Sequence, residues 1–425
     1  MTRDDMKAQA GRYKPSVNIE RAPRGYVPLI YIGAGWLFLV LAAGVMIRQA
    51  HAVAYADFGD PWVVVVVHLV TLGFLSMTAM GVLNQWVPVV FDVPAMGPRR
   101  GLLYFGLYTV GVAGFVGGFG YRLWPLVAVS GAWLAGAIVL WSATILGQLV
   151  RSPKPRDVVH RGLQLAIAGF NVTWGLGLFM ALSFIGWWPE YQVLRAHLAT
   201  ALVAWLGCLI LTVQLKLNPM FALSKIDGLR PGIPLGLAGA GVVLAWVSAF
   251  TPVWVFRWAA LCWIVAALWT MAQSVYLVRR GKSARTDRLF IGVAAAWLLL
   301  LGAAVLAFWL SPLAVLLAFW GMTALVLSYQ TRILPFLVAL TVARRLPAPP
   351  GKAFFLAQAM HSISQPAIVG ALALVGAWAN VAGIVGHRPD FEVVAGLGVI
   401  LLVVSQAATV GLAMRRGGQR PAAGG

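Results

Sequence analysis

The chain has 425 residues, of which 61% are hydrophobic and only 10% are charged. Soluble domains of this size do not have such a composition, which is typical of chains with many membrane-crossing helices. The net charge of +20 does not indicate nucleic-acid binding, because the basic residues stand in short clusters between apolar runs. Cys208 and Cys262 lie inside apolar runs and belong to no CxxC motif or disulfide framework.

Twelve apolar runs follow a basic N-terminal tail, residues 1–27. A run of about 20 such residues crosses the ~30 Å hydrocarbon layer as a helix. The predicted spans are 28–48, 62–92, 101–120, 123–149, 162–187, 191–223, 232–250, 253–278, 289–309, 311–343, 353–379 and 393–414. The expected fold is therefore an all-α membrane domain, residues 28–414, followed by a C-terminal tail, residues 415–425.

The distribution of lysine and arginine supports this number of spans. With the N-terminus in the cytoplasm, the cytoplasmic loops and tails hold 27 of the 32 basic residues. The five on the other side are Arg48, Arg122, Arg195, Arg257 and Arg388. An extra or missing span would scramble the division. The sequence thus predicts a multi-pass protein of a bacterial or archaeal cytoplasmic membrane, with both termini cytoplasmic.

The second, sixth and tenth spans are the longest, and each has a proline near its inner end: Pro88, Pro219 and Pro335. His68 precedes the first of these prolines by 20 residues, and His197 precedes the second by 22. The tenth span has no histidine at that depth. Because similar helices recur at about a third of the chain length, we expect three four-helix repeats. Their predicted ranges are 28–149, 162–278 and 289–414.

Residues 84–99, Asn-Gln-Trp-Val-Pro-Val-Val-Phe-Asp-Val-Pro-Ala-Met-Gly-Pro-Arg, carry a resemblance to a known family. They resemble the end of helix 2 in haem–copper oxidase subunit I, whose fold also has twelve helices in three arcs. The chain looks closest to a divergent branch near the NnrS-type membrane haem proteins. The resemblance implies haem b as cofactor, with copper as a further candidate. It implies membrane lipid, respiratory-chain subunits, quinol or cytochrome c as partners.

The chain also departs from that family. The predicted seventh and tenth helices contain no histidine, so the family's three-histidine copper site and its oxygen-reducing haem ligand are absent. Although the family members are oxidoreductases, we do not expect oxidase-like oxygen reduction here, and whether this chain is an enzyme stays open.

Two histidines within the spans are the main candidate ligands, since ionisable groups inside a membrane usually have a function. The resemblance implies that His68 binds haem iron, and that His197 binds haem iron or copper. The alternative for both is a neutral histidine hydrogen-bonded between helices. A third histidine, His361, stands in a polar cluster that favours such an interhelical hydrogen bond.

Arg388 lies in the loop where the resembling family places arginines that bind haem propionates. Arginine pairs with carboxylates through two hydrogen bonds, which suits that role. The alternative is an ordinary loop arginine.

The function expected from these residues is that of a haem-binding membrane protein. It would serve in electron transfer, in nitric oxide or oxygen handling, or in assembly of respiratory metal centres. One alternative is a haem-free transporter of a small molecule or metal, and another is an inactive structural partner of a respiratory complex. No Asp, Glu or Lys is predicted deep inside a span, which disfavours an ion-coupled transporter.

The predicted orientation is tested with reporter fusions. A reporter in the loop at Lys154 is expected to report cytoplasm, and one in the loop at Asp390 the opposite side, because of the basic-residue distribution. A cytoplasmic signal at Asp390 would contradict the twelve-span topology.

Overall fold

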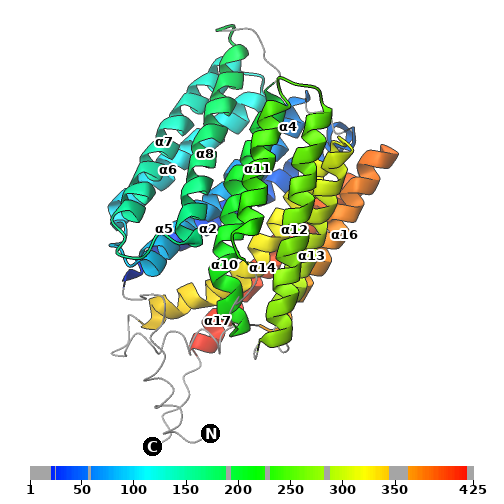
Figure 1. Ribbon diagram of the computed structural model, residues 1–425. Helices are drawn as coiled ribbons and strands as arrows, with labels where there is room; N and C mark the ends of the chain where they lie inside the picture. The colour runs from blue at the N-terminus through cyan, green and yellow to red at the C-terminus, as the bar shows by residue number, and fades with distance from the viewer. Residues whose placement is uncertain are drawn as a thin grey trace, which may run out of the picture.

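The computed structural model describes residues 21–23, 25–55, 59–187, 193–224, 230–281, 288–343 and 362–418. Within these ranges every regular element is a helix (Figure 1). Eleven helices are long and apolar enough to cross a membrane, and the shorter α11 (Ile233–Val247) is also apolar. The protein is therefore an all-α, multi-pass integral membrane protein with about eleven candidate transmembrane helices.

The described helices follow one another along the chain in three parts. The first third holds α2 (Tyr26–Arg48), α3 (Ala50–Ala54), α4 (Pro61–His68), η2 (Leu69–Ser76), α5 (Met77–Phe91), α6 (Pro98–Gly120) and α7 (Trp124–Val150). The second third holds α8 (Val158–Ser183), α9 (Leu194–Ala199), η3 (Thr200–Gly207), α10 (Cys208–Ala222), α11 and α12 (Trp254–Arg280). The last third holds α13 (Leu289–Phe308), α14 (Leu313–Ala343), α16 (Gln365–Gly386) and α17 (Pro389–Gly418). In Figure 1, α6, α7 and α8 lie at one side of the bundle and α12, α13 and α16 at the other.

Most predicted boundaries differ from the structure by a few residues, among them those of the two spans nearest the C-terminus. The span predicted at 353–379 corresponds to α16, which ends at Gly386; residues 353–361 lie outside the described ranges. The span predicted at 393–414 corresponds to α17, which begins earlier, at Pro389. Proline favours the first turn of a helix because it needs no backbone N–H there, and hydropathy alone does not detect this start.

Three long helical units, here called rods, hold the prolines noted above. Rod 1 is α4–η2–α5, rod 2 is α9–η3–α10, and rod 3 is α14. In the predicted repeat all three rods run in the same direction. The end of the bundle at which the rods begin is here called the distal end. In rods 1 and 2 the central segments η2 and η3 are π-helical. A π-helical turn contains one more residue than an α-helical turn and often marks a functional site.

Rods 1 and 2 correspond residue for residue. Pro88 and Pro219 are 131 residues apart. Adding the same offset to the residue numbers of η2 and α5 gives the full ranges of η3 and α10. It also relates Asp92 to Leu223, which both end their rods in the left-handed backbone conformation. This correspondence supports an internal repeat. Rod 3 is α-helical throughout and has no π segment.

The rods contact one another through hydrogen bonds in the core. The Trp205 indole N–H of rod 2 donates to Ser76 Oγ of rod 1 over 2.9 Å. The Tyr329 hydroxyl of rod 3 donates to Asn218 Oδ1 of rod 2. Buried polar groups need such partners, because water does not reach them inside a membrane domain. The rods therefore form the centre on which the outer helices pack.

A buried polar chain connects α14, α16 and α17. The Trp320 indole N–H donates to Asn380 Oδ1 over 3.0 Å, and Asn380 Nδ2–H donates to Glu392 Oε2 over 2.5 Å. Glu392 has no exposed surface. Glu392 lies in the first turn of α17, before the predicted span 393–414, so this buried carboxylate stands near a helix end and not deep inside a span.

We expect Glu392→Ala to lower the free energy of unfolding by about 1–3 kcal/mol, since the buried Asn380 amide would lose its acceptor. Glu392→Gln keeps an acceptor oxygen and is expected to cost less. Thermal unfolding in detergent measures both. The control is Asp390→Asn, whose side chain is 60% exposed. Equal losses for Glu392→Ala and the control would contradict a structural role for this chain.

Candidate functional site

His68 is the last residue of α4, directly before the π segment of rod 1. Its Nδ1 lies 2.8 Å from the backbone oxygen of Val64, one turn earlier. A carbonyl oxygen only accepts hydrogen bonds, so Nδ1 must carry the proton and donate. In the neutral ring, Nε2 then has a free lone pair.

His197 has the same arrangement, but its partner belongs to another helix. It lies in α9, and its Nδ1–H donates to the backbone oxygen of Thr173 in α8 over 3.1 Å. The ring packs against Gly177, where an added Cβ would lie 3.2 Å from the imidazole Cε1. The absence of a side chain at Gly177 therefore makes room for the ring.

Both histidines line one cavity of about 740 Å³. The cavity lies between α4–η2, α6, α7, α8 and α9–η3, with a single residue, Phe319, from α14. Its size falls within the ~300–1,000 Å³ that ligand pockets usually have. The structure thus brings together the two candidate ligands that the sequence places 129 residues apart.

Aromatic rings form part of the walls of this histidine cavity. The His68 ring lies nearly parallel to Phe119, at 9° with centroids 6.0 Å apart, and edge-on to Phe115. Phe170 and Trp205 stack with centroids 4.2 Å apart. Flat apolar walls with a few polar groups are the usual surroundings of a planar cofactor.

The hydroxyl groups on these walls are already engaged. Thr71 donates to Val67 O, and Thr173 donates to Gly169 O, each over 2.8 Å within its own helix. No hydrogen bond to Nε2 of either histidine is found within the described ranges. The two Nε2 lone pairs are therefore the groups on the wall that are suited to bind a metal ion.

The two histidines do not occupy equivalent positions of the repeat. The offset of 131 residues that relates the rods takes His68 to Ala199, and His197 stands two residues earlier. Two residues correspond to about 200° around a helix. Because of this difference, His197 faces the same cavity as His68, whereas Ala199 lines a second cavity between rods 2 and 3.

The other predicted site residues lie elsewhere. Arg388 follows α16 and pairs with Asp390 through two hydrogen bonds of 3.0 and 2.7 Å. It is not among the residues that line the histidine cavity, whereas Arg195 is. His361 lies outside the described residues. Among the residues that are described, no group of three or more His, Cys, Asp or Glu side chains forms a metal site.

Sequence reasoning missed two features of this region. The partner of His197 is a backbone oxygen of Thr173, and backbone groups of a distant helix leave no signal in the sequence. The π segments have no sequence signature of their own either. In the sequence, Arg195 is predicted only to be a basic residue outside the cytoplasm. Its position two residues before the candidate ligand His197 is a signal that could have placed it near the site.

Comparison with known protein families gave no matching family model, and no significantly similar curated protein was found. The chain is thus defined by its fold class, a multi-pass membrane protein, and by the histidine cavity described above.

Proposed function

We propose that this protein is a membrane cytochrome that binds haem b through His68 and His197 and transfers electrons. The observation that carries the proposal is the pair of imidazoles on one cavity, each with Nδ1–H bonded to a backbone carbonyl. A bound haem b would supply a one-electron couple. The proposal keeps the haem site that the resemblance to oxidase subunit I implies, and it leaves out the copper chemistry of that family.

The hydrogen bonds of the two rings suit this role. Histidine ligands usually donate their second nitrogen to a carbonyl or carboxylate, which fixes the ring and increases its basicity. Val64 O and Thr173 O serve here as such acceptors. Without a ligand, each Nε2 would be an unpaired polar atom in apolar surroundings, which is unfavourable. Metal coordination satisfies both atoms.

Two imidazoles on the same cavity favour electron transfer over gas binding. If His68 and His197 together held the haem iron, the iron would supply a one-electron couple and would be closed to nitric oxide and oxygen. Because the proposal has His68 and His197 share one haem iron, it favours iron over copper as the metal at His197. The proposal does not depend on Arg388, whose guanidinium already pairs with Asp390. Twelve spans with cytoplasmic termini remain part of the proposal, supported by the distribution of basic residues along the chain.

We expect purified protein to show a Soret band and, when reduced, to bind carbon monoxide poorly. His68→Ala is expected to lose most of the haem. His197→Ala is expected to lose haem or to retain it with an open axial position, so that carbon monoxide then shifts the Soret band.

The controls for this experiment are His51→Ala, an exposed residue of α3, and His361→Ala, and both are expected to retain haem. Unchanged haem content in folded His68→Ala would remove the central claim. Absence of any Soret band in protein purified from haem-supplied cells would instead favour the haem-free transporter.

Gly177→Ala tests the position of the His197 ring. The new methyl group would lie 3.2 Å from Cε1, which is tighter than ordinary contacts, so the ring must shift. We expect altered axial ligation, seen as a change of spin state in the absorption spectrum, with little loss of stability. Gly175→Ala, on the same helix, meets no atom within 4 Å and serves as the control. Identical spectra for both variants would exclude His197 as a ligand in this position.

A further inference from the structure

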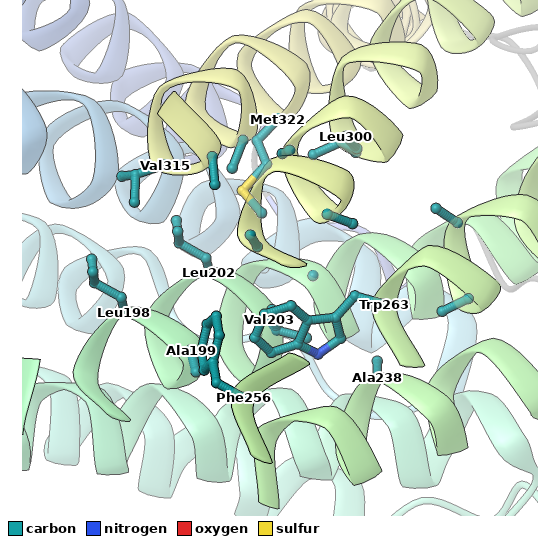
Figure 2. A pocket seen from close by; sticks show the side chains of 18 of the residues that line it. Leu198, Ala199, Leu202, Val203, Ala238, Phe256, Trp263, Leu300, Val315 and Met322 are labelled. Carbon is teal, nitrogen blue, oxygen red and sulfur yellow. The ribbon is translucent and has the colours of Figure 1, made fainter. Parts of the chain in front are cut away.

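A second cavity of about 400 Å³ lies between rod 2, α11, α12, α13 and rod 3 (Figure 2). It is the repeat counterpart of the histidine cavity. Six residues of rod 1 that line the first cavity have counterparts, 131 residues later, that line the second. These counterparts are Arg195, Leu198, Ala199, Leu202, Val203 and Gly207.

The chemistry of the second cavity differs from that of its counterpart. Alanine replaces His68, leucine replaces Thr71, and glycine replaces Ser76. Among the side chains labelled in Figure 2, the heteroatoms are the Trp263 nitrogen and the Met322 sulfur. The Trp263 nitrogen packs against Gly241 of α11. The interior of this second cavity is therefore mainly apolar, and its polar groups are the indole N–H groups of Trp263 and Trp297, for which no hydrogen-bond partner is found among the described residues.

The cavity is long and runs along the bundle. Its wall on rod 2 extends from Arg195 to Leu211, a rise of roughly 24 Å at 1.5 Å per residue. Its wall on α14 and the preceding turn extends from Pro312 to Met322, roughly 15 Å on the same basis. One leaflet of a bilayer is also roughly 15 Å deep, half of the ~30 Å hydrocarbon core. The dimensions fit one extended hydrocarbon chain.

The charged group and the hydroxyl group of the wall are found at the distal end. Arg195 is the single charged residue of the described wall, and Ser311 lies at the same end, in the turn before α14. The Ser311 hydroxyl oxygen accepts from the backbone N–H of Leu313. Arg195 is exposed and pairs with no carboxylate within the described ranges. A cation at the mouth of an apolar cavity is complementary to an amphiphile with an anionic head.

We propose that this second cavity binds one acyl chain of an anionic phospholipid from the distal leaflet, with the lipid phosphate on Arg195. Arginine at a membrane interface forms paired hydrogen bonds with phosphate oxygens. The acyl chain fills the apolar interior between rods 2 and 3. The inference goes beyond the proposed function, since it requires no haem.

The test is native mass spectrometry of the full-length protein in detergent. Phosphatidylglycerol and phosphatidylcholine with the same acyl chains are added in equal amounts. We expect one retained phosphatidylglycerol with a several-fold preference over phosphatidylcholine. Arg195→Gln is expected to abolish the preference, whereas Arg48→Gln, at another exposed distal arginine, keeps it.

Two substitutions that fill the second cavity test whether the acyl chain binds there. Ala307→Phe and Val315→Phe each place a ring into the cavity, and both are expected to lose the retained lipid. Ala294→Phe, on the exposed face of the same helix α13, is the control and is expected to keep it. Gel filtration verifies that each variant is folded. Retention of phosphatidylglycerol by both cavity-filling variants would overturn the proposal.

Haem absorbance of the same samples separates this inference from the proposed function. Loss of haem in Arg195→Gln with an unchanged lipid preference would overturn the lipid site and assign Arg195 to the haem. A sample without haem that still prefers phosphatidylglycerol would support the lipid site and count against the cytochrome.

Discussion

The constraint on which this structure depends is that a polar group inside a membrane domain must find its partner within the protein. Helices satisfy the backbone groups, and threonine hydroxyls along rods 1 and 2 donate to carbonyl oxygens four residues earlier. The side chains of Trp205, Tyr329 and Asn380 donate hydrogen bonds to side chains of other helices. Within the described part of the chain some buried side-chain atoms still have no partner, among them both amide atoms of Gln85 and Gln406. The Nε2 atoms of His68 and His197 differ from these because both imidazoles line one large cavity.

Much of the fold follows from the sequence because hydrophobicity and helix length are local properties. The long apolar runs mark the rods, and Pro88, Pro219 and Pro335 mark their correspondence. The start of α17 was misplaced because the hydropathy of Asp390 and Glu392 suggests a loop. Tertiary packing decides otherwise, since Asn380 offers a partner for Glu392 and makes its burial tolerable.

The two histidines of the candidate site could be predicted from the sequence, but their arrangement in space could not. His68 and His197 are visible in the sequence because ionisable residues are rare in the spans. Their common cavity depends on a two-residue difference in position between the rods, which turns one ring by about 200°. Nothing local in the sequence says which cavity each face of a rod meets. Arg388 does not line this cavity and pairs with Asp390, so the propionate contact implied by the resemblance stays a prediction.

The π segment η3 separates the two cavities by the thickness of a single helix. Leu202 belongs to the walls of both, while Val203 and Gly207 line one side and Trp205 and Leu206 the other. A ligand that displaces this partition from one side changes the space on the opposite side. Thermodynamic linkage then requires the influence to be mutual, with the same coupling free energy in each direction. Under the two proposals, the lipid composition of the membrane would thereby act on the histidine cavity, and a ligand of the histidine cavity on the bound lipid.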